Sequence, residues 1–280
     1  MLRTRALKVL GPEDLAGVRA LLDRDPVAHV FVASRVHASG MEPWRLGGEM
    51  WGWYEGSELV SACYSGANLV PVEATPDALR AFADRARRQG RRCSSIVGPA
   101  AEVGDLWQRL EPVWGPARSV RLCQPVMVAD RALVVGCDPN VRRVVPDELD
   151  VLLPACIAMF TEEVGISPLL SDGGRLYRGR VADLIRAGRA FARIEGGEVV
   201  FKAEIGAASP QACQVQGVWV APSRRGEGFS GPGLAAVVET ARRDIAPLVS
   251  LYVNDFNLAA RAAYRSIGMT EVGAFASVLF

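Results

Sequence analysis

The sequence predicts an α/β protein in which one architecture is used twice. Strand and helix signals alternate along its 280 residues, and the order of the first half returns in the second. Between the halves, residues 129–142 contain the turn formers Gly136, Pro139 and Asn140. The length also suits about two domains of ordinary size. We therefore predict one domain at 1–135 and a second at 140–280.

The first half should open with a strand and reach a long helix that Thr75 caps, with Pro76 as its first residue. Its expected elements are a strand at 6–10, helices at 12–24 and 27–37, strands at 49–54 and 58–65 in a hairpin, a strand at 68–73, the helix from 76, a strand at 93–97, a helix through 103–110 and a hairpin-like region to 128.

The second half repeats this order. Its expected elements are a helix region at 145–159, a polar loop at 160–171, a helix at 175–187, a hairpin of strands at 191–195 and 198–207, a strand at 212–220, a helix at 233–243, a strand at 248–253, a helix at 258–267 and two final strands that end at 280.

Composition excludes several classes of function. Half of the residues are hydrophobic and 22% are charged, which is typical of a globular protein with a sizeable core. The net charge is +1 without a basic block, so nucleic acid is not expected as a partner. Because no apolar run spans a bilayer and the N-terminus turns polar early, we expect a soluble, cytoplasmic protein without a membrane partner.

Cysteine and histidine usage narrows the chemistry further. The six cysteines lack CxxC spacing, so reduced thiols are expected rather than disulfides or a metal site. The two histidines, His29 and His37, both lie in the first half. A catalytic site centred on a histidine of the second half is therefore excluded.

A glycine-rich segment in the second half indicates anion binding. The apolar strand Val218-Trp219-Val220 leads through Pro222 into Arg224-Arg225-Gly226-Glu227-Gly228-Phe229-Ser230 and a helix. Closely spaced glycines let the main chain approach an anion, and N–H groups then point at it from the positive end of the helix. The two arginines add positive charge. The segment predicts a pyrophosphate cradle, although an ordinary strand-to-helix turn can have the same pattern.

A second segment follows a buried strand. Asn257 stands at the N-cap position of a helix, and the small residues Ala259, Ala260 and Ala263 permit close approach along it. Tyr264 projects from this helix, and Gly268 ends it.

Together the two segments resemble the GCN5-related N-acetyltransferase (GNAT) superfamily. The family's cofactor motif, Q/R-x-x-G-x-G/A, is matched from Arg225 to Ser230, with Ser230 for the last small residue. Its second motif, N-x-x-A-x-x-x-Y-x-x-x-G-F, is matched from Asn257 to Met269, with Met for Phe. The chain resembles actinobacterial two-domain GNAT proteins. This implies a mixed α/β fold of two tandem domains, each a mostly antiparallel sheet flanked by helices.

The resemblance implies acetyl-CoA as co-substrate. Main-chain amides of Arg225, Gly226, Glu227, Gly228, Phe229 and Ser230 would hold its pyrophosphate. On the strand Val218-Trp219-Val220, main-chain groups of Val218 and Val220 would pair with the pantetheine arm. Asn257 would reach that arm beside Ala260. Tyr264 would lie near the thioester sulfur as general acid for the thiolate, unless it is only a packed helix aromatic.

The general base is left open by the sequence. Family members with a glutamate on the strand before the cofactor turn place it where this chain has Gln214, which cannot take a proton. Candidates are Glu204 on the neighbouring strand and Glu162 or Glu163 in the segment before Gly165. Glu204 could instead pair with Lys202, which points to the same side of the strand. Glu162 and Glu163 could bind a cationic acceptor or simply face solvent.

The first half lacks the cofactor motif. After its third strand stands Glu73-Ala74-Thr75-Pro76-Asp77, which carries two carboxylates and no glycine and would repel a pyrophosphate. We expect this domain to support the catalytic one and to shape an acceptor groove. Its aromatic residues either line that groove or pack into the core: Trp44, Trp51, Trp53 and Tyr54.

The sequence therefore predicts an N-acetyltransferase in which an acceptor amine attacks the acetyl thioester directly. Rival hypotheses are a non-catalytic acyl-CoA-binding or regulatory module, and a tandem-GNAT transferase of the aminoacyl or mycothiol-synthase-like kind. The missing glutamate at position 214 favours the module, and Tyr264 argues against it. The identity of the amine and the choice between monomer and dimer are open.

Overall fold

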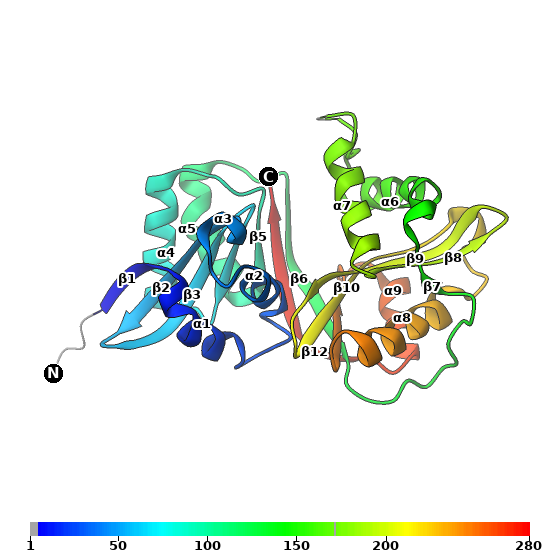
Figure 1. Ribbon diagram of the computed structural model, residues 1–280. Coiled ribbons are helices and arrows are strands. Elements are labelled where there is room, and N and C mark those ends of the chain that lie inside the picture. Colours follow the sequence, from blue (N-terminus) through cyan, green and yellow to red (C-terminus); the bar gives the residue numbers. More distant parts are fainter. Residues whose placement is uncertain (1–4, 171) are drawn as a thin grey trace. The chain divides into compact units, whose positions relative to one another are not determined.

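The computed structural model describes residues 5–170 and 172–280 and divides into two compact units (Figure 1). The first unit contains the chain up to Val126 together with Tyr252–Asn257 and Glu271–Phe280. The second contains Met127–Leu251 and Leu258–Thr270. Neither unit is continuous in sequence. The limits predicted from the sequence, 1–135 and 140–280, stay a prediction, and they differ from these units in the position of the C-terminal residues.

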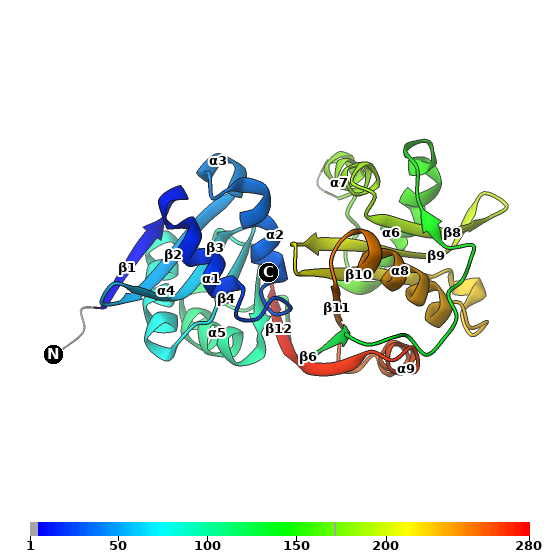
Figure 2. The same cartoon turned by 60° about the horizontal axis from the view of Figure 1, so that its bottom comes forward.

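The first unit is built on a mostly antiparallel sheet whose strands lie in the order β1-β2-β3-β4-β5-β12 (Figure 2). Among these strands only β4 and β5 pair in parallel, and the C-terminal strand pairs antiparallel with β5 through Phe275–Leu279. On its other side β12 neighbours β6 (Ser119–Ala129), whose residues up to Val126 belong to this unit. The strands are β1 (Arg5–Leu10), β2 (Gly48–Glu55), β3 (Glu58–Gly66), β4 (Asn68–Val72), β5 (Ser95–Pro99) and β12 (Thr270–Leu279).

Helices cover both faces of this sheet. Successive strand residues face opposite sides, so Met50 and Tyr64 pack with α1 and α2 while Trp51 and Cys63 pack with α4 and α5. Thr75 caps α4 by accepting the amide of Ala78, as its sequence position predicts. The helices are a 3-10 turn η1 (Pro12–Asp14), α1 (Leu15–Leu22), α2 (Val30–Ser39), α3 (Pro43–Leu46), α4 (Pro76–Gln89) and α5 (Ala100–Trp114).

The second unit has the same kind of sheet. Strands β7, β8, β9 and β10 pair antiparallel, and β11 pairs in parallel with β10. The bounds are β6 (Ser119–Ala129), which ends in this unit, β7 (Arg142–Arg143), β8 (Ala190–Glu195), β9 (Glu198–Ala208), β10 (Ala212–Val220) and β11 (Leu248–Tyr252). The fold class predicted from the sequence, mixed α/β with mostly antiparallel strands and flanking helices, is confirmed.

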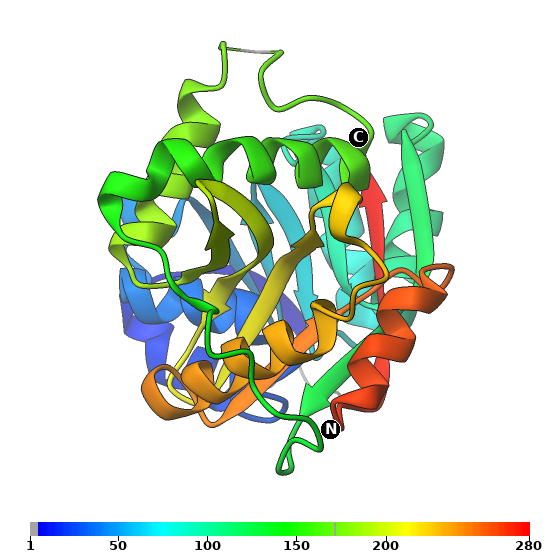
Figure 3. The same cartoon turned by 90° about the vertical axis from the view of Figure 1, so that its right-hand side faces the viewer.

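Figure 3 looks onto the second unit and shows α6 and α7 on one side of the strands and α8 on the other. On β9, Lys202 therefore faces α6, where it contacts Cys156, while Phe201 faces Gly233 of α8. The helices are η2 (Pro146–Glu148), α6 (Leu149–Val164), α7 (Arg175–Arg186), η3 (Pro222–Arg224), α8 (Ser230–Asp244) and α9 (Leu258–Ser266).

Three predicted elements are wrong. The hairpin-like region before residue 128 is the single strand β6, with Pro125 inside it, and the two final strands are the single strand β12. The loop predicted from residue 160 begins later, because α6 runs on to Val164 and ends where Gly165 takes a left-handed conformation with φ of 79°. The short elements α3 and β7 were not predicted.

Within residues 5–170 and 172–280, no helix is both long and apolar enough to cross a membrane.

Candidate functional site

In the second unit, the parallel strands β10 and β11 separate part of the way along their length. They pair from Ala212 to Gln214 against Leu248 to Ser250, and no later pair joins them in the described part of the chain. Beyond that point β10 stays attached only to β9, and its residues 216–220 are half-buried. The edge of β10 that faces β11 is thus open to a ligand that supplies main-chain hydrogen bonds.

A bulge in β10 shapes this opening. The pairing with β9 shifts between Gln216 and Trp219, and Gly217 takes a φ of 59° in the shifted stretch. A Cβ at Gly217 would lie 2.9 Å from Cε of Met159 and 3.1 Å from Nζ of Lys202. The left-handed conformation favours glycine here, and the short distances show that the bulge holds the strand close to α6 and β9.

The glycine-rich turn follows directly after β10. Gly226 and Gly228 have φ of 87° and 85°, a conformation that other residues adopt only at a cost. The helix α8 then begins at Ser230, three residues earlier than predicted. Its first-turn amides, such as that of Gly231, have no acceptor within the helix, as at every helix N-terminus. The turn is exposed and presents main-chain N–H groups and a positive helix end to an anion.

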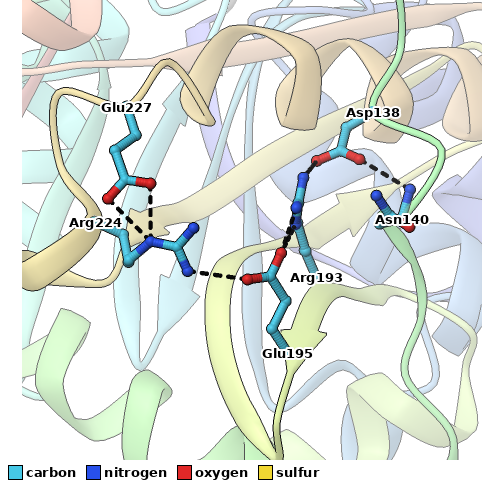
Figure 4. Close-up of polar contacts among 6 residues, drawn as sticks. All are labelled: Asp138, Asn140, Arg193, Glu195, Arg224 and Glu227. Carbon is cyan, nitrogen blue, oxygen red and sulfur yellow. Dashed lines mark hydrogen bonds and ion pairs between the residues drawn. The ribbon is translucent and has the colours of Figure 1, made fainter.

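Figure 4 shows a network of ion pairs that braces this turn. Arg193 donates to Asp138 over 2.8 Å and to Glu195 over 2.6 Å, and Arg224 donates to Glu195 over 2.9 Å. Arg224 also pairs with Glu227 at 2.9 Å. Hydrogen bonds from Arg224 and Arg193 lower the pKa of Glu195, which keeps it charged. Both guanidinium groups lie over the ring of Phe229, at 4.8 and 4.6 Å.

The second arginine of the turn is also paired. Arg225 donates to Glu162 on α6 over 2.7 Å, and the indole of Trp219 donates to the other oxygen of Glu162 over 3.4 Å. The expectation that Arg224 and Arg225 add positive charge at the turn stays a prediction. Both arginines pair with carboxylates here, and these ion pairs hold the turn in place.

Glu204 lies in a buried cluster beside the bulge. It accepts a hydrogen bond from Gln216 over 2.7 Å and pairs with Lys202 at 3.3 Å and with Arg180 at 3.6 Å. Burial alone would raise the pKa of Glu204, but attraction to Lys202 and Arg180 and the hydrogen bonds outweigh burial and lower it. Glu204 is thus ionised and paired with Lys202 and Arg180. The pair with Lys202 is one of the two alternatives that the sequence left open for Glu204.

Tyr264 is buried on α9, with 7% of its surface exposed. Burial raises the pKa of its phenol, and the negative charge of Glu163 raises it further. Tyr264 therefore keeps its proton over the whole physiological range, and Glu163 on α6 lies within its electrostatic reach. Asn257 precedes α9 directly and belongs to the first unit, where its amide donates to the carbonyl of Asn254. Ala260 is half-buried on α9, and Gln214 is buried where β10 and β11 part.

The aromatic residues of the first unit do not share one groove. Trp51 is fully buried and packs against Phe82 at 6.4 Å, with Trp53 beside it in the same cluster. Tyr54 lies on the opposite face of the sheet and donates to Asp14, while Trp44 is 81% exposed. Trp51 and Trp53 therefore pack into the core and do not line a groove.

Sequence reasoning missed most of the bracing network. The sequence pattern places Asp138 only in the segment between the halves, yet its carboxylate accepts a hydrogen bond from Arg193, 55 positions away. Arg193 and Glu195 are two residues apart on β8 and so lie on the same face of the strand. This spacing is the sequence feature that indicates their ion pair. Nothing in the local pattern connects either residue with Arg224 or Phe229.

Comparisons with known proteins agree with this architecture. A family model described as a domain of unknown function (DUF4081) matches residues 48–152, which is less than half of the chain. No curated protein matches the chain. Solved structures are similar over almost the whole length of the chain, and three of them are described next.

A GNAT-family acetyltransferase from Colwellia psychrerythraea is 15% identical with a TM-score of 0.58, over 98% of this chain and 99% of that one. A GCN5-related N-acetyltransferase from Sphaerobacter thermophilus is 17% identical with a TM-score of 0.57, over 98% and 95%. A Drosophila protein is 11% identical with a TM-score of 0.66, over 99% of both chains. The chain therefore has the fold of the GNAT superfamily, the fold that its two sequence motifs predict.

Proposed function

We propose that the second unit binds acetyl-CoA and transfers its acetyl group to a primary amine. The observation that carries this proposal is the opening between β10 and β11, which leads directly into the glycine turn and the N-terminus of α8. An extended pantetheine arm would pair with the main chain of Val218 and Val220, and the turn amides would bind the pyrophosphate. The GNAT fold supports acyl transfer from an acyl-CoA to an amine as the general activity.

The chemical step is a direct displacement. The amine nitrogen attacks the thioester carbonyl, a carbon–nitrogen bond forms, and the carbon–sulfur bond breaks. Tyr264 gives its proton to the leaving thiolate. The phenol carries its proton at neutral pH, as this role requires, and burial raises its pKa. The same shift makes it a weaker acid, so the proton would be given to the developing thiolate and not to the neutral thioester sulfur.

Among the three candidate carboxylates, we assign the proton-accepting role to Glu163. Glu162 already uses both oxygens, toward Arg225 and Trp219. Glu204 is bound to Lys202 and Gln216 and has a lowered pKa, so it is a weak base. Glu163 is the candidate whose charge reaches Tyr264, and a carboxylate there would bind the acceptor ammonium ion and take its proton.

Replacing Gly228 by Ala tests the cofactor site. A left-handed alanine costs roughly 1–2 kcal/mol, and relief of that strain would turn the amides away from the pyrophosphate. We expect acetyl-CoA binding, measured by calorimetry, to weaken by about tenfold or more, since several amide contacts are lost together. The matched control is Gly115→Ala, which has a similar φ of 78° and equally open surroundings at the end of α5. Equal affinities in the two variants would contradict the assigned site.

A panel of amines separates catalysis from mere binding. Release of the CoA thiol from acetyl-CoA should depend on an added amine and should stop in the Glu163→Gln variant. The non-catalytic acyl-CoA module remains the second candidate, because the buried residue where the strands part is the neutral Gln214. Tight acetyl-CoA binding without turnover of any amine would favour that module. An aminoacyl transferase would turn over only with an aminoacyl donor, and a mycothiol-synthase-like enzyme only with its own acceptor amine.

A further inference from the structure

The first unit contains a cavity of its own, of about 250 Å³. It lies where β4 and β5 end, beyond their short parallel pairing of Asn68 and Leu69 with Ser95 and Ile96. Four of the residues that line it are titratable: Asp25, His29, Glu73 and Glu102. The remaining wall is mainly apolar and includes Val126 and Phe275. Three carboxyl groups and an imidazole thus share one small space with apolar side chains.

His29 enters this cavity as a hydrogen-bond acceptor. Its side chain is 2% exposed, and its Nε2 lies 3.0 Å from a carboxylate oxygen of Glu73. A carboxylate accepts, so Nε2 donates this bond, and in the neutral ring Nδ1 is then an acceptor. Nδ1 is buried and has no hydrogen-bond partner. A buried polar atom of this kind costs stability unless a ligand satisfies it.

Two glutamates of the cavity are held in place by main-chain contacts. Glu73 has a left-handed main chain with φ of 49°, uncommon for a residue with a side chain, and Ser61 donates to its carbonyl oxygen over 2.7 Å. Glu102 accepts the amide of Ala74, but its Oε2 is buried without a partner. Burial, and then the charge of Glu73, raise the pKa of Glu102 to about 7. Glu73 is already bound by His29 and Arg24, and Asp25 accepts the amides of Val27 and Ala28. Among the described residues, Glu102 Oε2 and His29 Nδ1 are the buried atoms of the cavity that have no hydrogen-bond partner.

We propose that this cavity binds a small primary ammonium ion with a short alkyl body. Such an ion carries three N–H donors and no acceptor, which complements Glu73, Glu102 and Nδ1 of His29. Its charge offsets the carboxylates, and its alkyl part packs against Val126 and Phe275. A cavity of about 150 Å³ admits benzene, so the space here accommodates a short alkylammonium ion. This site belongs to the first unit and is independent of acetyl transfer.

An organic cation fits better than a metal ion. Within residues 5–170 and 172–280, no group of three or more His, Cys, Asp and Glu side chains has the geometry to hold a metal. Apolar side chains also make up most of the wall, whereas hard cations require oxygen ligands on most sides.

Calorimetry of the full chain with n-butylammonium chloride tests the proposal, with n-butanol as the uncharged probe of the same size. Glu102→Gln should weaken binding of the ammonium ion by about tenfold or more, because a charged partner is replaced by an amide that also donates. The matched control is Glu111→Gln, at an exposed position on the same helix α5, which should leave the affinity unchanged.

The pH dependence provides a second readout. Glu102 ionises around its pKa of about 7, so wild-type affinity should fall roughly tenfold from pH 8 to pH 6 as this carboxyl takes up a proton. The other titratable or charged groups that face the same space are Asp25, Glu73, His29 and Arg24. Glu102→Gln should remove most of the pH dependence.

Several outcomes would overturn the proposal. Equal binding of n-butanol and n-butylammonium would show that charge is not recognised, and unchanged affinity in Glu102→Gln would place the site elsewhere. Should Glu102→Gln fail to fold by circular dichroism, Ala274→Leu blocks the same cavity by bulk and must abolish binding. Neither result depends on whether the second unit transfers acetyl groups, and Tyr264→Phe should leave n-butylammonium binding unchanged.

Discussion

Replacing Tyr264 by Phe should lower kcat for acetyl transfer by a factor of about 10²–10⁴, the usual contribution of a positioned general acid. Acetyl-CoA affinity should stay the same, since Phe fills the same buried space on α9. The measurement is steady-state release of the CoA thiol with a saturating amine. The substitution removes the proton donor for the leaving thiolate, which lowers kcat, and leaves the acetyl-CoA contacts unchanged.

Tyr177→Phe is the matched control. Tyr177 is also a tyrosine of the second unit, its hydroxyl donates to the carbonyl of Cys156 over 2.9 Å, and burial raises its pKa too. Losing this hydroxyl should cost roughly 1 kcal/mol of stability with little effect on kcat. If both variants lose the same activity, or if Tyr264→Phe remains fully active, Tyr264 is not the acid.

The pKa of Tyr264 adds a pH test. Burial raises this pKa above its usual value near 10, and the active form is the protonated one. The rate therefore should not decline between about pH 8 and pH 10 through loss of this proton. A decline of the wild-type rate with a midpoint below pH 9 that disappears in Tyr264→Phe would contradict the raised pKa.

The second large effect concerns stability. Glu204→Gln should lower the free energy of unfolding by about 3–5 kcal/mol, the range seen when one partner of a buried ion pair is removed. Lys202 is 1% exposed and would be left buried next to Cys156 without its carboxylate partner. The double variant Lys202→Met with Glu204→Gln should recover most of the loss, because no buried charge is left uncompensated. Urea unfolding of the four proteins gives the coupling energy.

Asp183→Asn is the control for this cycle. Its partner Arg186 and Asp183 itself are both 68% exposed, so this pair should contribute at most about 0.5 kcal/mol. A loss in Glu204→Gln no larger than in Asp183→Asn would contradict the structural role of the buried pair. Conversely, a stable Glu204→Gln protein without activity would make Glu204 the base in place of Glu163.

The same group predicts how stability changes with pH. The pKa of Glu204 is lower in the folded state than in the unfolded chain. Its contribution is therefore complete above the unfolded pKa and is lost as pH falls through the folded value. Acid unfolding of the wild type should be steeper than that of the double variant, which lacks this carboxylate.

Sequence reasoning was most successful where one residue and its near neighbours decide the structure. The hairpins at 49–65 and 191–207 and the cap at Thr75 follow from side-chain periodicity, turn residues and capping over a few residues. The prediction failed for β6, where the sequence suggested a hairpin and the structure has one strand. Residues of a strand that is buried on both faces do not alternate in polarity, and which strands are buried in this way depends on the assembled sheet.

By itself, the sequence determined the fold class, the glycine turn at Gly226 and Gly228, and the helix that carries Tyr264. These depend on local conformational energies and on a spacing of residues that is visible in one dimension. Only the tertiary structure decided where β10 and β11 part, which carboxylates are already paired, and that Glu73 and Glu102 share a cavity with His29. Such contacts join residues far apart in the chain, 63 positions in the case of Arg225 and Glu162. Burial and Coulomb attraction select those partners only after the sheet and its helices have packed.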